Sequence, residues 1–129
     1  MNEQQLKCLQ LGDWVQAEGK EEPQQVTVIG NDGSIELNDE YYCTIEDLCS
    51  MWLTQDILNK NFDRDYKTWV ITDKLRVEIN GNSGKQWVLT LRTEECGYPF
   101  HFVAFYAFNF VHELQNALRL FGIDKEIEV

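Results

Sequence analysis

The stretch VTVIGNDGSIEL, residues Val26–Leu37, decides how the first half of the chain folds. It holds two short apolar runs separated by Asn31-Asp32-Gly33. Asn and Gly both tolerate positive φ, so this triplet predicts a tight turn. After the turn, apolar residues alternate with polar ones, which is typical of a half-buried strand. The stretch therefore predicts a β-hairpin.

Further short runs flank this hairpin. Leu9–Val15 precedes a break at Gly19–Pro23, and on the other side Thr44–Asp47 has a capping pattern that suits one helical turn. Cys49–Leu53 then reads as another strand. Three or four short strands, a turn of helix and a closing strand are the order of a small SH3-like β-barrel or half-barrel. That likeness concerns architecture and implies no function.

A short helix is expected next. Thr54 is a good N-cap, and apolar side chains share one face from Gln55 to Asn61. We predict that residues 1–60 form an acidic small-β module with this helix at its end. The joint to the second half is expected at residues 61–67.

The second half, residues 61–129, begins with a predicted hairpin. Residues 69–79 form its first arm, which a bend at residues 72–73 could split, and the turn lies at residues 80–84. The return arm starts near Trp87. A third strand, Phe100–Phe108, is apolar on both faces, so we expect it at the centre of its sheet, covered on both sides.

The last helix is predicted from Phe110 to Phe121, with Asn109 as its N-cap and Gly122 in the left-handed conformation after its end. Residues 123–129 read as a short edge strand. The fold class is therefore α+β: an N-terminal SH3-like module and a C-terminal antiparallel sheet against which this helix packs, in one compact unit overall.

Composition narrows the class of protein. The chain has 129 residues, of which 43% are hydrophobic, and a net charge of −11. It can bury a core, and its many aromatic residues argue against disorder. Because it has no surplus of cations, we expect no direct binding to nucleic acid. Residues 1–60 hold three cations and twelve anions. These anions either meet a basic partner or form a solvated face, and the second is commoner.

The sequence favours a cytoplasmic location. The N-terminal residues lack a secretory signal, and no stretch is apolar enough to predict a membrane span. The four cysteines have no CxxC spacing, which favours reduced thiols over a metal or redox site. They are Cys8, Cys43, Cys49 and Cys96.

The sequence predicts no catalytic residue, metal or cofactor. His112-Glu113 begins an HExxH pattern, but Asn116 stands where the second histidine would be. A nucleophile pair of Cys8 or Cys96 with His101 or His112 can be drawn, yet no neighbouring sequence activates a thiolate. We expect His112 to pack against the apolar stripe of the last helix or to bond a nearby backbone group.

Aromatic residues supply the candidate interaction surface. Core positions are favoured for Trp14, Trp52, Trp69 and Trp87, whereas an exposed Trp or Tyr would mark a binding face. The adjacent pair Tyr41-Tyr42 must lie on opposite faces of a strand, so one ring should be exposed. The candidates for a binding surface are Tyr41, Tyr42, Trp14, Trp52 and His112.

One resemblance covers most of the chain. The C-terminal run Val111–Ile123 (VHELQNALRLFGI), the run Leu11–Val15 (LGDWV), the acidic segment Ile45–Leu48 and the run Leu53–Leu58 occur in this order and spacing. They resemble short uncharacterised proteins of Bacteroidetes-type gut bacteria and their prophages and mobile elements. The resemblance implies a compact cytosolic protein linked to a phage or mobile element. It implies no activity and no site residue.

Three functions remain open. The first is a non-enzymatic interaction module with an unknown protein partner, which predicts an exposed apolar patch containing Trp or Tyr. The second is an acidic decoy that mimics nucleic-acid charge and occupies a DNA-binding host protein, which predicts salt-sensitive binding. The third is an enzyme of unrecognised type, which predicts a deep pocket with a histidine beside a carboxylate or thiol.

Overall fold

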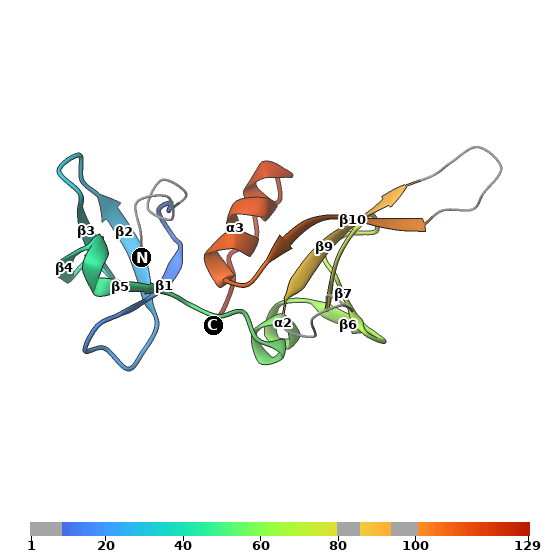
Figure 1. Ribbon diagram of the computed structural model, residues 1–129, viewed down its shortest axis with the longest axis horizontal. Coiled ribbons are helices and arrows are strands. Elements are labelled where there is room, and N and C mark those ends of the chain that lie inside the picture. Colours follow the sequence, from blue (N-terminus) through green and yellow to red (C-terminus); the bar gives the residue numbers. More distant parts are fainter. Residues whose placement is uncertain (1–8, 80–85, 94–100) are drawn as a thin grey trace. The chain divides into compact units, whose positions relative to one another are not determined.

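The computed structural model describes residues 9–79, 86–93 and 101–129 of the protein (Figure 1). These residues form two antiparallel sheets and two α-helices, which confirms the predicted α+β class. The chain divides into two compact units. The first unit combines the residues up to Leu53 with Phe110–Ile127, and the second spans Thr54–Asn109. In the described part of the chain, no helix has the length and apolar character needed to cross a membrane.

The first unit is a five-stranded sheet with one helix. Its sheet has the order β4-β3-β2-β1-β5, so β4 and β5 stand at opposite ends and no pairing between them closes the described strands into a barrel. The SH3-like barrel is therefore not confirmed. The elements are β1 (Trp14–Ala17), β2 (Gln24–Ile29), β3 (Ser34–Leu37), β4 (Tyr41–Thr44), the 3-10 turn η1 (Ile45–Asp47), β5 (Leu48–Ser50) and α3 (Val111–Leu120).

The core of this unit follows the alternation that the sequence shows. On β1 and β3 every second side chain is buried: Val15 and Ala17 on β1, Ile35 and Leu37 on β3. The predicted hairpin is present as β2 and β3, and its turn contains Gly33 at φ +87°. The Asp32 carboxylate accepts the Ser34 N–H at 3.1 Å and the Ser34 hydroxyl at 2.7 Å, which fixes the turn. The buried cluster comprises Leu9, Val15, Ala17, Val26, Ile35, Leu37, Cys43 and Leu48.

The helix α3 begins one residue later than predicted. Its N-cap is Phe110, not Asn109. The Glu113 carboxylate accepts the Phe110 N–H at 3.2 Å. A side chain in the first turn of the helix therefore satisfies the backbone N–H of the N-cap residue. The sequence signal for this cap is Glu113, which stands three residues after Phe110.

The C-terminal end of α3 matches the prediction. Gly122 has φ +70°, and its N–H donates to Arg119 O at 3.0 Å. The Ile123 N–H donates to Leu118 O at 2.9 Å. These two bonds are those of a Schellman motif, which ends a helix by satisfying its last carbonyls.

The position of α3 corrects one expectation. We expected the helix on the C-terminal sheet, but it belongs to the first unit and contacts β1 there. Its buried side chains include two polar ones, His112 and Gln115. A purely apolar stripe would suit either sheet, whereas Gln115 has specific partners beside β1, the Trp14 N–H and Gly12 O.

The second unit is a second five-stranded sheet, of order β10-β9-β8-β7-β6, with one short helix. The helix matches the prediction: Thr54 Oγ1 accepts the Ile57 N–H at 3.3 Å as its N-cap. The elements are α2 (Gln55–Asn61), β6 (Asp63–Asp65), β7 (Thr68–Val70), β8 (Leu75–Ile79), β9 (Trp87–Thr93) and β10 (His101–Phe108).

Two predictions for this sheet were wrong. The segment 69–79 is not one arm with a bend, because β7 and β8 pair with each other as antiparallel strands. The strand β10 was expected at the centre, but it stands at one end of the described sheet. The predicted turn at residues 80–84 lies outside the described residues.

The core of the second unit gathers around two tryptophans. Trp69 is fully buried and meets Trp87 edge to face, with ring centroids 5.5 Å apart. The indole N–H of Trp69 donates to Asn59 Oδ1 at 2.9 Å, which ties α2 to the sheet. This confirms the core positions predicted for these two residues.

Residues 123–129 form no strand, which corrects the predicted edge strand. They are held by side chains instead. The Trp14 indole donates to Ile127 O at 2.7 Å. Farther on, Asn61 Nδ2 donates to Glu128 O at 2.7 Å while Asn61 Oδ1 accepts the Glu128 N–H at 2.8 Å. The backbone bonds that a strand would make are therefore made by an indole and an amide.

Candidate functional site

An exposed row of side chains crosses three strands of the first unit. Val28 on β2 pairs with Glu36 on β3, and Glu36 pairs with Tyr42 on β4. Residues directly opposite in a ladder share one face. Val28 is 44% exposed and Tyr42 is 67% exposed. We call Val28, Glu36 and Tyr42 the outer face.

The backbone between β3 and β4 places Tyr42 outward. Asn38 and Asp39 have φ of +52° and +60°, and the Glu40 N–H donates to Leu37 O at 3.0 Å. Two consecutive positive φ values are typical of the type I′ turn, which fixes the register of a hairpin. The register opposes Tyr41 to the buried Leu37 and Tyr42 to Glu36.

The Glu36 carboxylate is held in place on this face. The Thr27 hydroxyl donates to its Oε1 at 3.3 Å. Glu36 lies directly opposite Tyr42 in the ladder, and its carboxylate raises the pKa of the Tyr42 hydroxyl. The outer face thus presents an aromatic ring beside a fixed negative charge.

Tyr41 has the opposite orientation. It is half-buried and packs against the core of the first unit. The Lys20 ammonium lies 5.0 Å from the centroid of its ring. The alternation therefore predicted correctly that one tyrosine of the pair is exposed, and the structure identifies it as Tyr42.

The other aromatic candidates have different environments. Trp52 is 63% exposed, and its ring lies tilted against the Phe110 ring with centroids 4.8 Å apart. The core position predicted for Trp52 is therefore wrong. Trp14 is half-buried, and its indole N–H is already bonded to Ile127 O at 2.7 Å. Trp52 therefore provides a second exposed aromatic surface for a partner, whereas the half-buried Trp14 leaves little of its ring available for binding.

His112 is a buried residue. It is 2% exposed, and its ring stacks on Phe110 with centroids 5.9 Å apart. Its Nδ1 has no hydrogen-bond partner. Burial lowers the pKa of this imidazole, while the negative charges of Asp13 and Glu113 oppose the shift. The prediction that His112 packs against apolar groups is confirmed by the Phe110 ring, and among the described residues the alternative, a bond to a nearby backbone group, is not found.

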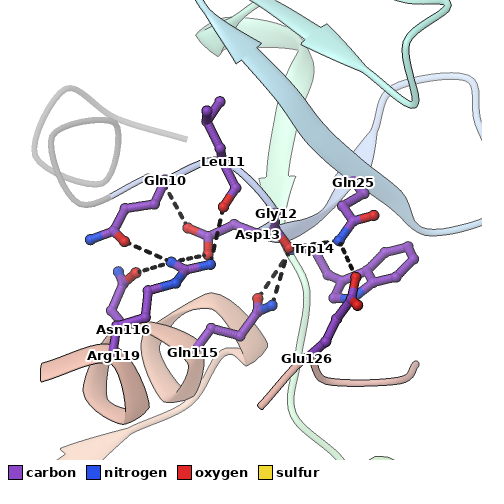
Figure 2. Close-up of polar contacts among 10 residues, drawn as sticks. All are labelled: Gln10, Leu11, Gly12, Asp13, Trp14, Gln25, Gln115, Asn116, Arg119 and Glu126. Atoms are coloured by element: carbon purple, nitrogen blue, oxygen red, sulfur yellow. Dashed lines mark hydrogen bonds and ion pairs between the residues drawn. The ribbon is translucent and has the colours of Figure 1, made fainter. Parts of the chain in front are cut away.

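A polar cluster joins α3 to the segment before β1, and sequence reasoning missed it (Figure 2). The fully buried Asp13 carboxylate pairs with Arg119 Nη1 at 2.7 Å and accepts the Gln10 N–H at 2.8 Å. Gln115 accepts the Trp14 N–H at 3.2 Å and donates to Gly12 O at 3.1 Å. Burial raises the pKa of Asp13, and the Gln10 N–H and the Arg119 charge oppose that rise.

This cluster holds α3 against the segment before β1 and is poorly suited to binding a ligand or catalysing a reaction. Arg119 Nη1 also donates to Gln10 Oε1 at 2.9 Å and Asn116 Oδ1 at 3.0 Å, and Nη2 donates to Leu11 O at 3.2 Å. A guanidinium with this many internal acceptors has little capacity left for a ligand. One sequence signal could have revealed Asp13, because it has the same parity as the buried Val15 and therefore points inward.

A cavity of about 280 Å³ lies beside the cluster. Its lining combines cations, anions and amides, and two of the amides, Gln25 and Gln115, already donate to Gly12 O. The cavity contains neither a histidine nor a thiol. It is lined by Leu11, Gly12, Gln25, Gln115, Arg119, Ile123, Asp124, Lys125 and Glu126.

The described residues offer no group of three His, Cys, Asp or Glu side chains that could hold a metal ion. Cys43 and Cys49 are free thiols, and burial raises the pKa of the Cys43 thiol, which disfavours a thiolate. Cys8 and Cys96 lie outside the described residues. The pairings drawn for them stay untested.

No family model, curated protein sequence or solved structure matches this chain. The candidate site therefore rests on the geometry above.

Proposed function

We propose that the protein is a non-enzymatic protein-interaction module and that the outer face is its binding surface. The observation that carries this proposal is the exposure of Tyr42, an aromatic side chain that is 67% exposed at the middle of an ordered strand. Aromatic residues supply much of the free energy of protein–protein binding. A ring on a sheet also loses little conformational entropy when a partner covers it.

Three finer descriptions belong to the same proposal. The order of four strands, a 3-10 turn and a fifth strand supports an SH3-like half-barrel for the first unit. The free thiols of Cys43 and Cys49 support a reducing compartment such as the cytoplasm. The sequence resemblance supports a role in a phage or mobile element.

A second candidate function is favoured by one observation. Between Glu21 and Leu53 the chain has eight anions and no Lys or Arg: Glu21, Glu22, Asp32, Glu36, Asp39, Glu40, Glu46 and Asp47. Such a surface suits an acidic decoy that occupies a DNA-binding protein by mimicking nucleic-acid charge. An enzyme of unrecognised type is the weakest alternative, because the described residues bring no histidine together with a thiol.

The test is affinity capture from the native host followed by mass spectrometry. The protein, a Tyr42→Ser variant and a Tyr66→Ser variant serve as baits. Tyr66 is a matched control because it is also an exposed tyrosine, at 83%, but lies in the second unit. We expect a partner that the protein and Tyr66→Ser retain and Tyr42→Ser loses.

Three outcomes would change the assignment. Partners that bind Tyr42→Ser as well as the protein would place the binding surface elsewhere. A captured DNA-binding protein that duplex DNA displaces would favour the decoy. Recovery of no partner together with turnover of a screened metabolite would favour the enzyme.

A further inference from the structure

The outer face has the chemistry of a site for a cation. The Tyr42 ring is exposed, Glu36 lies directly opposite it on β3, and the Glu36 carboxylate accepts the Thr27 hydroxyl at 3.3 Å. An ammonium or guanidinium group gains from both an aromatic face and an adjacent carboxylate. The two groups together therefore favour a positively charged side chain over an apolar or negative one.

The neighbouring tyrosine shows the same preference inside the protein. The Lys20 ammonium lies over the Tyr41 ring at 5.0 Å. In the part of the chain that the structure describes, no Lys or Arg lies over the Tyr42 ring. The face of the Tyr42 ring is thus available to a cation, whereas Lys20 already lies over the Tyr41 ring.

The surroundings of the outer face carry one sign of charge. Asp39 and Glu40 lie in the turn before β4, and Glu46 lies in η1 after it, all three exposed. No Lys or Arg stands in the sequence between Lys20 and Lys60. Charge complementarity therefore favours a basic partner.

Among the described strands, β4 stands at one end of its sheet and pairs with β3 alone. A strand at an edge can accept an extended segment, and alternate side chains of that segment then face the same surface. An edge strand usually carries Lys or Pro as protection against such pairing, and β4 (YYCT) has neither.

We propose that the outer face binds an extended, Arg- or Lys-rich segment of a partner protein, with one cation over the Tyr42 ring and paired with Glu36. This inference rests on the proposed interaction function and adds the chemistry of the partner. It differs from the decoy, because it needs one fixed ring and carboxylate and not a broad anionic surface.

The test uses a labelled peptide of about eight residues that alternates Arg and Thr, near the length of an ordinary strand. Its affinity for the full chain is measured by fluorescence anisotropy at low salt. A peptide alternating Glu and Thr is the ligand control. We expect saturable binding of the basic peptide only, with the largest amide shifts in NMR spectra at residues 41–44.

Four variants separate a specific site from general attraction between opposite charges. Tyr42→Ser and Glu36→Gln should each weaken binding about five-fold, and Tyr42→Phe should retain most of the affinity because the ring remains. Glu21→Gln removes the same charge from an exposed position outside the outer face, and it should change the affinity less than about two-fold. All three positions are partly or fully exposed, so the fold should persist.

The inference is overturned if Glu36→Gln and Glu21→Gln weaken binding equally, if the acidic peptide binds as well, or if no saturable binding occurs. These results are distinct from failure of the proposed function. A host partner that Tyr42→Ser loses, combined with no binding of the basic peptide, would keep the interaction module and reject a basic partner.

Discussion

The Asp13 side chain has no exposure to solvent, so its negative charge must be stabilised by the groups around it. The Arg119 guanidinium and the Gln10 N–H are its two partners. Removing one member of a buried ion pair leaves the other group uncompensated, which is more costly than the pair itself is worth. The cluster therefore specifies where α3 meets β1 more than it adds to stability.

We expect Asp13→Ala to lower the free energy of unfolding by about 3 kcal/mol, because Arg119 loses its carboxylate and the Gln10 N–H loses its acceptor. Urea denaturation measures this change. The exposed carboxylate of Glu18 in the same unit is the control, and Glu18→Ala should change the free energy of unfolding by less than about 0.5 kcal/mol. Equal effects of the two substitutions would show that the ion pair contributes nothing specific.

His112 should make stability depend on pH. Burial lowers its pKa below the ordinary value of 6.5, so the unfolded chain takes up a proton at a higher pH than the folded protein does. Stability is then fully present above about pH 6.5 and falls as the pH is lowered through the folded pKa. Asp13, whose pKa is raised by burial, acts in the opposite direction.

Thermal unfolding at about pH 7.5 and pH 5.5 tests this dependence. We expect the melting temperature of the protein to fall on acidification and that of His112→Leu to fall less. An identical fall in both would show that His112 is not the group responsible.

At the scale of the element, the Schellman motif after α3 depends on one glycine. A Cβ at Gly122 would meet no atom within 4 Å, so the cost of a substitution is conformational and not steric crowding. Gly122→Val should lower the free energy of unfolding by about 1–2 kcal/mol, because a β-branched residue is disfavoured at positive φ. Gly122→Asn should cost less, since Asn tolerates this conformation. Denaturation curves that rank the two variants in the reverse order would contradict the motif.

Local patterns predicted the elements that depend on neighbours in sequence. Thr54 predicted the start of α2, the apolar stripe predicted α3, and Asn31-Asp32-Gly33 predicted the turn of the first hairpin. The alternation also predicted that Tyr41 and Tyr42 face opposite ways. Which of them is exposed depends on the turn at Asn38-Asp39, where both residues have positive φ and neither is glycine.

The rest depends on partners far away in the chain. Arg119 is 106 residues from Asp13, and helical spacing cannot indicate an anion at that separation. The place of β10 at a sheet edge depends equally on the order of pairing, which the composition of a single strand does not determine. Because its two faces are apolar, the strand looked central in the sequence.

At the scale of the whole molecule, each unit has a buried core of its own. We expect Leu58→Ala, which removes a fully buried side chain from α2, to cost about 2–5 kcal/mol in the second unit. Hydrogen exchange should then accelerate for amides of β7 to β9 and change little for amides of β2 to β4. Leu37→Ala, a matched deletion in the first core, should give the reverse pattern. Equal acceleration throughout would show that the molecule opens as a single cooperative body.

The amide of Asn61 has a consequence for the chemical ageing of the protein. Its nitrogen donates both to Glu128 O and to Ile57 O, each at 2.7 Å. Spontaneous deamidation would replace this nitrogen with an oxygen, and two carbonyl oxygens would then face an acceptor instead of a donor. Loss of these bonds would release the last residues of the chain. The reaction changes the mass by about one dalton and adds one negative charge, so isoelectric focusing of stored protein would detect the deamidated form.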